Sequence, residues 1–405
     1  MPDPAGTAAP DTSLKNVKAL GIVSLLTDAS SEAIYPILPL FLSSVLGTPV
    51  AVIGIIESIA EATASLMKVF SGWLSDRVGR RRPLILLGYG LSNLMKPILA
   101  IAGSWPAVLA LRFADRFGKG IRTAPRDALI ADSAAPEVRG KAFGLHRALD
   151  TLGAAIGPLI AWATLSLVHG EAGFRTVFLI SAIPGTAAIV VLALAVRERR
   201  PHAPATGTRP PLGFRHLGMP FGVFTAISAV FALGNSSDAM LILRAKDLGA
   251  ATALVPLMYF IFNLVGSAIA APAGNLSDRI GRRRVLTIGF ALYGVVYAGF
   301  ALASHTWAPW LLFAAYGVPY ALTEGMARAF VVDLVGPECR ATAIGSYTFV
   351  LGLAALPSSA VAGILWDTVG HSAPFTLSAV LMLVAAFALG LAGRFLKPLD
   401  ACLAR

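Results

Sequence analysis

Apolar runs of about 20 residues, long enough to cross the hydrocarbon core of a bilayer as helices, recur along almost the whole chain. Short polar stretches separate them. Apolar and polar positions do not alternate within a run, so the pattern favours helices over the strands of a membrane barrel. We count about twelve runs and predict an all-α integral membrane protein with about twelve transmembrane helices.

Composition agrees with this pattern. Of the 405 residues, 56% are hydrophobic and 14% are charged, whereas roughly a quarter of the residues of a soluble domain are charged. The connections between the predicted helices are short on the outer side and cannot hold a soluble catalytic domain. We therefore expect a protein that acts within the bilayer and is not an enzyme.

The net charge of +11 is unevenly distributed along the chain. Most basic residues fall in the predicted tails and in the loops of one side, whereas Arg175, Arg244 and Lys246 are expected near the other side. Loops rich in Lys and Arg remain in the cytoplasm during membrane insertion. We therefore expect a multi-pass protein of a bacterial inner (cytoplasmic) membrane, with both termini cytoplasmic and no nucleic-acid partner.

Cysteine and histidine do not indicate a metal or redox site. Cys339 and Cys402 are both predicted on the cytoplasmic side, where disulfides are rare. The histidines are scattered without the spacing of a metal site, and no phosphate-binding loop is present. We expect no metal and no cofactor, and hence an ion gradient as the source of energy.

One polar stretch occurs twice. The first copy is Gly72-Trp-Leu-Ser-Asp-Arg-Val-Gly-Arg-Arg-Arg82, and the second is Gly274-Asn-Leu-Ser-Asp-Arg-Ile-Gly-Arg-Arg-Arg284. Each copy lies between two apolar runs and is predicted to form a tight basic turn. Because the copies lie half a chain length apart, they indicate a duplicated domain.

The repeated stretch resembles the signature loop of the major facilitator superfamily, G-x-L-x-D-R-x-G-R-R, which joins the second and third helices. The matching residues are Gly72, Leu74, Asp76, Arg77, Gly79, Arg80 and Arg81, and then Gly274, Leu276, Asp278, Arg279, Gly281, Arg282 and Arg283. The resemblance implies two pseudo-symmetric six-helix bundles with a substrate cavity between them. It also implies a cytoplasmic gate, in which Asp76 contacts the start of the eleventh helix near residues 341–345 and Asp278 contacts the start of the fifth near Lys141.

The duplication also divides the chain into segments. We predict a cytoplasmic tail at 1–17, a six-helix bundle at 18–196, a cytoplasmic linker at 197–214, a second six-helix bundle at 215–396 and a cytoplasmic tail at 397–405. The first helix is expected to run without a break over 18–46, and the second over 51–73.

Placing a charged side chain at the centre of a membrane helix costs at least about 2.5 kcal/mol. The charged residues of the predicted helices must therefore face a cavity or pair with an opposite charge. Helical periodicity places those of 51–73 on one face and most of those of 107–132 on another. The candidates for the proton-coupling and substrate cavity are Asp28, Glu32, Glu57, Glu61, Lys68, Arg112, Asp115, Arg116, Lys119, Asp238 and Glu324. The alternative is that they only pair with one another and stabilise the bundle. We favour that alternative for Arg126, Asp127, Arg147 and Asp150.

Glu57 and Glu61 are the first candidates for the proton carrier. They lie one turn apart and repel each other when both are charged, so one is expected to bind a proton near neutral pH. Arg116-Phe-Gly-Lys-Gly120 resembles the R-x-x-x-G pattern that is associated with proton coupling in many members of the superfamily. In the competing interpretation Lys68 and Arg116 neutralise both carboxylates permanently. Asp28 and Glu32, at the same spacing, are the reserve pair.

The stretch Gly153-Ala-Ala-Ile-Gly-Pro158 resembles the G-x-x-x-G-P motif of drug–proton antiporters. The resemblance implies export, although Ala161 and Trp162 replace a glycine pair of that motif. A face of small residues that packs against another helix is an equally good explanation. We include Gly153, Gly157 and Pro158 among the candidate gating residues.

We predict a secondary active transporter that works by alternating access and exports a small drug or metabolite in exchange for protons, as a monomer in the lipid bilayer. A proton-coupled symporter that imports a metabolite or metal chelate is the alternative, and a membrane sensor that does not transport is less favoured. Coupling is expected in the N-terminal half, while the C-terminal half shapes the pocket. Its aromatic residues, Tyr259, Phe260, Tyr293, Tyr297, Tyr316, Tyr320 and Phe349, are mostly expected to pack or face lipid.

Overall fold

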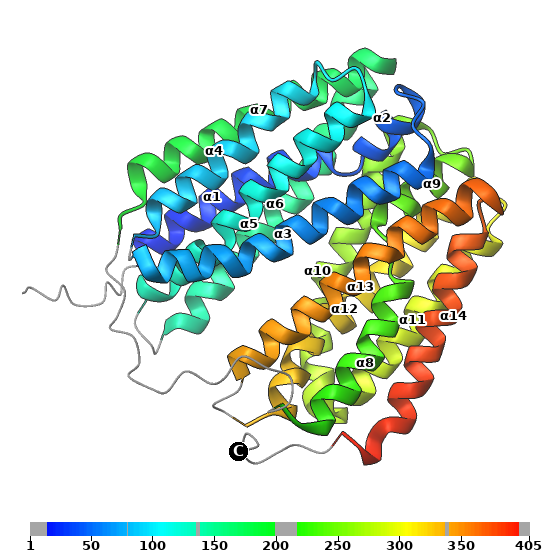
Figure 1. Cartoon of the computed structure of the whole chain (residues 1–405). Coiled ribbons are helices and arrows are strands. Elements are labelled where there is room, and N and C mark those ends of the chain that lie inside the picture. Colours follow the sequence, from blue (N-terminus) through cyan, green and yellow to red (C-terminus); the bar gives the residue numbers. More distant parts are fainter. Residues whose placement is uncertain (1–13, 79, 135–137, 199–216, 337–339, 397–405) are drawn as a thin grey trace, which may run out of the picture.

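The computed structural model describes residues 14–78, 80–134, 138–198, 217–336 and 340–396 of the chain (Figure 1). All regular elements in these residues are helical. The N-terminal half contains α1 (Lys15–Ile34), α2 (Leu38–Ser44), α3 (Val50–Val78), α4 (Arg82–Leu99), α5 (Trp105–Asp132), α6 (Arg139–Leu167) and α7 (Gly170–Ala195).

The C-terminal half contains α8 (Gly218–Gly234), α9 (Asp238–Asp247), the short 3-10 helix η3 (Thr252–Leu254), α10 (Val255–Ile280), α11 (Arg282–Leu302), α12 (Ala308–Leu334), α13 (Arg340–Thr368), α14 (Ala373–Leu391) and the 3-10 turn η5 (Ala392–Arg394). In Figure 1 the two halves form separate bundles, blue to green and green to red. The all-α fold predicted from the apolar runs is confirmed.

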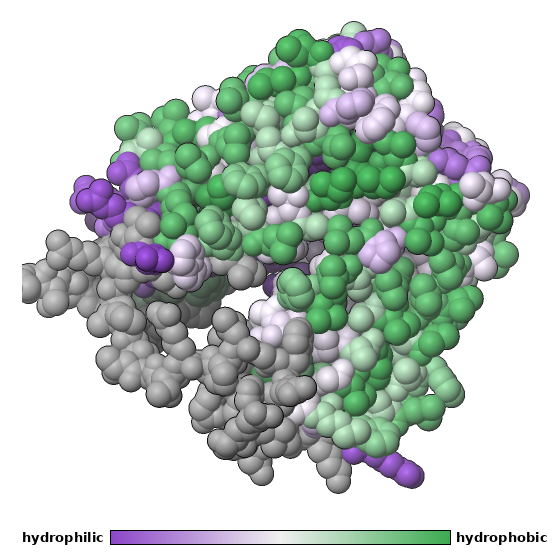
Figure 2. All heavy atoms as spheres, viewed as in Figure 1, coloured by the Kyte–Doolittle hydropathy of each residue, from purple (hydrophilic) through white to green (hydrophobic). Residues whose placement is uncertain are grey.

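The flanks of the molecule are apolar. Large hydrophobic side chains such as Ile101, Leu167 and Leu302 are at least four-fifths exposed, and Figure 2 shows hydrophobic residues over the flank with hydrophilic residues gathered at the ends. Eight helical segments in the described residues are long and apolar enough to cross a membrane. The long helices α1, α4, α5 and α12 fall outside these eight because they carry more polar and aromatic residues.

The prediction of an unbroken first helix over 18–46 is wrong. The chain leaves helical geometry between α1 and α2, at residues 35–37. Pro36 and Pro39 lack the backbone N–H that a continuous helix needs, and proline is accepted at the start of a new helix, where Pro39 lies. Residues 235–237 separate α8 from α9, and the Ser237 side chain caps α9.

Most of each signature stretch is helical rather than a turn. The helix α3 continues to Val78, and α10 continues to Ile280, so that Gly281 alone joins α10 to α11. Gly281 has a φ of 89°, a conformation that glycine adopts without strain. At the first copy, the backbone N–H groups of Arg81 and Arg82 donate to the carboxylate of Glu198 at 3.0 and 2.9 Å, which ties the start of α4 to the segment after α7.

The two halves meet through α3 with α13, α6 with α10, and α2 with α9. We call the end of the molecule that carries the signature stretches the loop end, and the opposite end the far end. At the far end a Cβ on Gly54 would lie 2.1 Å from the carbonyl oxygen of Ser359, and one on Gly363 would lie 2.6 Å from that of Val50. The backbones of α3 and α13 are therefore in direct contact there.

A carboxylate also stabilises the contact between α3 and α13 at the far end. Asp367, near the end of α13, accepts hydrogen bonds from the backbone N–H of Val50 at 3.3 Å and of Ala51 at 2.8 Å. These groups form the N-terminus of α3, where a negative charge is stabilised by the helix dipole. The halves are thus closed at the far end, and Figure 1 shows them diverging toward the loop end.

Within the N-terminal half, the small residues of α6 pack against α1. A Cβ on Gly153 would lie 2.3 Å from the carbonyl oxygen of Leu25, and one on Gly157 would lie 2.7 Å from the backbone nitrogen of Ala33. The explanation of this stretch as a packing face is confirmed. Its connection with export stays a prediction.

We expect Gly157→Ala to lower the thermal stability of the purified protein, because the new methyl group meets backbone that cannot move away, at a cost of about 1–3 kcal/mol. Gly144→Ala is the matched control on the same helix, since a Cβ at Gly144 meets no atom within 4 Å. The melting temperature in detergent measures both variants. Equal melting temperatures would contradict the tight α1–α6 contact.

We expect Asp367→Ala to shift the protein toward a conformation open at the far end, because α3 loses the charge that neutralises its N-terminus, worth about 0.3–1 kcal/mol. Spin labels at the exposed positions Ser44 and Val369 report the distance between the halves by electron paramagnetic resonance. The distance distribution should gain a longer component. An unchanged distribution would show that the backbone contact alone closes this end.

Candidate functional site

A cavity of about 420 Å³ lies between the two halves. From the N-terminal half it is lined by Tyr35, Glu57, Ser58, Glu61, Ser65 and Lys68, and from the C-terminal half mainly by the 235–238 segment and by α11, α12 and α13. Lys68 lies eleven residues beyond Glu57 on α3, which is about 16 Å along the helix toward the loop end. Together with the closed far end, this lining makes the cavity open toward the loop end.

The best-defined charge pair at the cavity joins Glu57 of α3 to Arg112 of α5. One guanidinium nitrogen of Arg112 donates to both carboxylate oxygens, at 2.9 and 3.0 Å. Both residues are at least 95% buried. The pair can form because α3 and α5 approach closely: a Cβ on Gly120 would lie 2.4 Å from the Cβ of Met67. Arg112 therefore neutralises Glu57 directly.

A second, looser pair lies one turn further along. Arg116 is 3.8 Å from Glu61 and 3.9 Å from Asp115, and Asp115 is also 3.6 Å from Arg112. The Glu61 side chain is 55% exposed, in contrast to Glu57. Glu57, Glu61 and Lys68 thus line one cavity, as the helical periodicity of the sequence predicts. The base that binds Glu57, however, is Arg112 and not Lys68 or Arg116.

The carboxylates of α1 are arranged differently. Glu32 shares a small pocket behind the main cavity with Arg112, Asp115, Arg116 and Lys119. Among the described residues neither Asp28 nor Glu32 makes an ion pair, although Lys119 attracts both through space. From the sequence, Asp28 and Glu32 are predicted only as a reserve pair. Spacing within one helix cannot show whether a basic residue of another helix pairs with them.

Asp28 lies close to a second carboxyl group, that of Asp150 on α6, across the packed contact of α1 with α6. Asp150 accepts a hydrogen bond at 2.6 Å from Ser24, which lies one turn before Asp28 on α1, and one at 3.2 Å from Arg147. Two neighbouring carboxylates repel each other when both are ionised. Asp28 and Asp150 are therefore candidates to hold a proton inside the N-terminal bundle.

Lys96 of α4 is a polar residue that the sequence analysis does not select. It is 3% exposed, and its ammonium group donates to the hydroxyl groups of Ser30 and Ser31 at 2.5 and 3.2 Å. In the sequence, the presence of a lysine within an apolar run is the feature that could have identified it. It lies next to the break between α1 and α2 and ties α4 to the end of α1.

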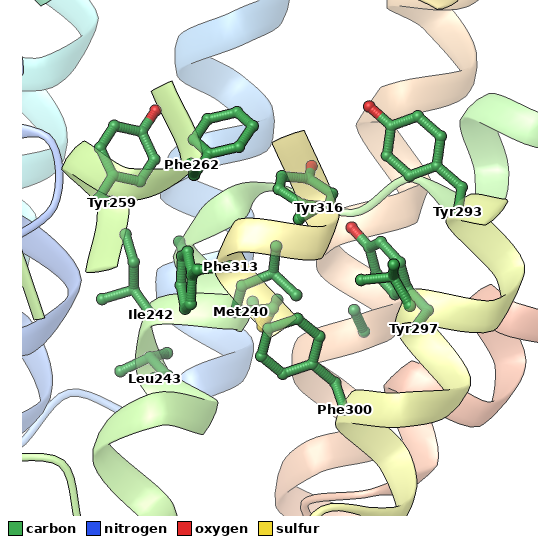
Figure 3. Packing of buried hydrophobic residues seen from close by; sticks show 14 of the residues in the cluster. Met240, Ile242, Leu243, Tyr259, Phe262, Tyr293, Tyr297, Phe300, Phe313 and Tyr316 are labelled. Atoms are coloured by element: carbon green, nitrogen blue, oxygen red, sulfur yellow. The ribbon is translucent and has the colours of Figure 1, made fainter. Parts of the chain in front are cut away.

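In the C-terminal half, the central polar residue is Asp238, in the first turn of α9. The hydroxyl of Tyr316 donates to one of its oxygens at 2.8 Å, and that of Tyr259 lies 3.4 Å from the other. In Figure 3 the hydroxyl groups of Tyr259, Tyr293 and Tyr316 point to the same side of a buried aromatic cluster. Glu324 forms its own ion pair with Arg328 at 3.1 Å.

The aromatic residues expected mostly to pack or face lipid include some that also line the cavity. Tyr297 is fully buried, and Phe349 is 48% exposed. Tyr293 and Tyr316 are packed in the buried core and also line the cavity, as does Tyr320. The four-residue spacing of Tyr293 with Tyr297 and of Tyr316 with Tyr320 places each pair on one helix face. That spacing was the available signal.

The candidate gating residues are distributed along both signature stretches. Gly79 and the side chain of Asp76 lie outside the described residues, as do Cys339 and Cys402. Asp278 is exposed and has no hydrogen bond or ion pair with the described residues. The predicted contacts of Asp76 and Asp278 with helix N-termini stay predictions.

The remaining gating candidates have mostly local contacts. Arg77 stacks on Trp73 with 5.4 Å to the ring centre, and Arg282 pairs with Asp333 at 2.6 Å. Gly72 faces Ala124, Gly274 faces Met326, and Pro158 lies within α6. Arg80 and Arg279 are exposed. No group of three or more His, Cys, Asp or Glu residues in the described part of the chain is arranged to bind a metal ion.

The chain is similar in sequence and in structure to known transporters. The chain is 38% identical over 358 residues to an uncharacterized MFS-type transporter of Methanocaldococcus jannaschii, with 87% of this chain and 88% of that protein covered. It is 27% identical over 172 residues to the multidrug resistance protein MdtG of Enterobacter lignolyticus, with 42% and 40% covered.

A solved structure of a bacterial homolog of the human lysosomal transporter Spinster, in an inward-facing and occupied conformation, matches with a TM-score of 0.77. The alignment covers 94% of this chain and 96% of that chain at 17% identity, which supports a shared fold. The family model described as Major Facilitator Superfamily matches residues 20–355 and 222–400. The chain therefore belongs to the major facilitator superfamily and is a multi-pass membrane transporter of small molecules, not an enzyme.

Proposed function

We propose that this transporter exports a small molecule in exchange for protons, from a bacterial-type inner membrane in which the loop end and both termini face the cytoplasm. The basic residues of the signature stretches support this orientation, because basic loops remain on the cytoplasmic side. In that orientation the cavity is open to the cytoplasm and closed to the outside, and a monomer contains the whole pathway. The partial similarity to a multidrug resistance protein is consistent with export.

The observation that carries the proposal is the group of carboxylates on and beside α1: Asp28 and Glu32 make no ion pair with the described residues, and Asp150 of α6 lies close to Asp28. A carrier needs a carboxyl group that binds and releases a proton as the protein changes conformation. Glu57 is poorly suited to this role because Arg112 holds it by two hydrogen bonds. We therefore assign proton transfer to Asp28 and Glu32, ahead of Glu57 and Glu61.

The packing of the two halves suggests how proton binding is coupled to movement. Asp28 and Glu32 are on α1, which packs on α6, and α6 in turn contacts α10 of the other half. A change in the charge of α1 can therefore bias the α6–α10 contact when the halves rock. A proton that moves down a potential of 100 mV supplies about 2.3 kcal/mol for each cycle.

Proteoliposomes that contain a pH-sensitive dye test the function. An imposed pH gradient, acidic on the far-end side, should drive an accepted compound across the membrane, and the compound should dissipate the gradient. A compound library supplies candidates, and oriented vesicles give the direction of transport. Transport in the same direction as the proton would favour the import alternative instead.

We expect Asp28→Asn to lose proton-driven accumulation and to retain exchange of labelled for unlabelled compound, because the carboxyl group that carries the proton is gone while the cavity is intact. Glu61→Gln should retain both activities. Glu57→Gln should mainly lower stability, since it leaves Arg112 buried without a partner, at a cost of about 3–5 kcal/mol. If Asp28→Asn still accumulates the compound and Glu61→Gln does not, the proton travels along α3.

We expect Asp76→Asn to slow transport at least tenfold, the loss of about 1.4 kcal/mol or more, with near-normal expression. The reason is that the loop end must close in each cycle, and the duplicated aspartate is the proposed closing contact. Glu171→Gln, at an exposed ion pair with Arg175 outside the signature stretches, is the control and should retain activity. Wild-type transport by the Asp76 variant would limit the signature stretch to an anchor of membrane orientation.

A further inference from the structure

We propose that the cargo of this transporter is an organic cation with an apolar body, and that its positive group binds at Asp238 between the aromatic residues of the cavity. This inference names the substrate class of the proposed function and rests on it, since it takes the cavity between the halves as the cargo site. Four observations carry it: the charge around Asp238, the rings beside it, the position of the basic residues and the shape of the cavity.

Among the described residues, no basic side chain lies within ion-pair distance of Asp238. Its oxygens face the uncharged hydroxyl groups of Tyr316 and Tyr259, and its place in the first turn of α9 puts it at the positive end of the helix dipole. The other carboxylates of the cavity, Glu57, Glu61 and Glu324, each have an arginine within 4 Å.

Aromatic rings surround this carboxylate. Tyr35, Phe231, Phe290, Tyr293, Tyr316 and Tyr320 all line the cavity. Tyr293 meets both Tyr316 and Phe231 edge to face, with 5.4 and 5.1 Å between ring centres. A ring face attracts a cation through its quadrupole, most strongly where water is excluded. A carboxylate among several rings is the chemistry that recognises a substituted ammonium or phosphonium group.

The rings come from both halves of the protein. Tyr35 lies at the end of α1, and its ring is 5.5 Å from that of Tyr259 on α10. A cation at Asp238 would therefore touch the N-terminal and the C-terminal bundle together. Contact with both halves is what a cargo needs in order to influence their relative movement.

The basic residues of the cavity are far from Asp238. Lys68 and Arg328 line its loop end, and Lys68 lies about 16 Å along α3 from Glu57, the residue of that helix nearest the far end of the cavity. A small zwitterion such as an amino acid cannot reach both Asp238 and Lys68. At the deep end Arg112 and Arg116 offset the charges of Glu57 and Glu61, so that Asp238 leaves a net negative charge, which favours a cation over an anion.

The cavity also has room for an apolar body. A side pocket of about 240 Å³ between α3 and α13 is lined by Leu66, Phe349, Leu353 and Leu356 among others. It shares Ser65, Lys68, Thr348 and Gly352 with the main cavity. The two spaces therefore adjoin at the contact of α3 with α13, where a Cβ on Gly352 would lie 3.5 Å from that of Ser65. The apolar body of a cation would lie against the rings of the main cavity, next to this apolar pocket.

Tetraphenylphosphonium and tetraphenylborate test the inference, because these ions have nearly the same size and shape and opposite charge. Equilibrium dialysis against the protein in nanodiscs measures the binding of each, and empty nanodiscs correct for uptake by the lipid. We expect the cation to bind at least about tenfold more tightly than the anion, a difference of about 1.4 kcal/mol. Equal binding, or no binding of the cation, would overturn the inference.

Variants locate the binding site. Asp238→Asn should weaken cation binding at least about thirtyfold, as expected for loss of one member of a desolvated charge pair. Tyr293→Leu should weaken it about tenfold and Tyr293→Phe should not, because the ring and not the hydroxyl attracts the cation. Glu171→Gln, at an exposed ion pair outside the cavity, is the control and should bind as the wild type does.

Unchanged binding by Asp238→Asn would place the cation elsewhere and overturn the assignment. If this variant does not fold, as judged by its melting temperature, the Tyr293 pair decides, and equal binding by its two members would reject the aromatic site. Dialysis needs no pH gradient. Failure of this inference is therefore distinct from failure of proton-coupled export, which the proteoliposome assay measures.

Discussion

The buried ion pair between Glu57 and Arg112 is the interaction on which the cavity wall of the N-terminal half depends. Neither charge could lie at this depth in a membrane alone, and removing one would leave the other without compensation. The pair requires α3 and α5 to approach closely, which Gly120 permits by its lack of a side chain. The same approach brings Arg116 near Glu61 one turn away. One steric feature therefore sets the position of most of the charges on this wall.

The two halves use this scaffold for different chemistry. The N-terminal half contains a network of acids and bases, in which Asp28 lies close to Asp150 and several other groups have ionic partners. In the described part of the C-terminal half, Asp238 is the cavity carboxylate without an ionic partner, and several aromatic rings line the cavity with it. Such a division separates the proposed proton site from the proposed cargo site. Movement of the halves, rather than direct competition for one residue, would then couple them.

Closure of the molecule uses a helix N-terminus. At the far end, glycines allow the backbones of α3 and α13 to touch, and Asp367 neutralises the start of α3. The proposed role of Asp76 at the start of α13 is the same device at the loop end. Alternating access would then be an exchange between two carboxylate–helix contacts on one pair of helices. Each contact is worth little free energy, which suits a protein that must open and close both ends in turn.

The all-α membrane fold and the polar faces of α3 and α5 could be predicted from the sequence, because bilayer thickness and helical periodicity act on each segment separately. The tertiary structure decided which groups meet. Arg112 rather than Lys68 binds Glu57, Asp150 lies beside Asp28 from a distant helix, and Tyr293 and Tyr316 line the cavity. Such contacts depend on how each helix is rotated and shifted against its neighbours. Close backbone approaches at a few glycines set that rotation and shift, and periodicity within one helix contains no information about them.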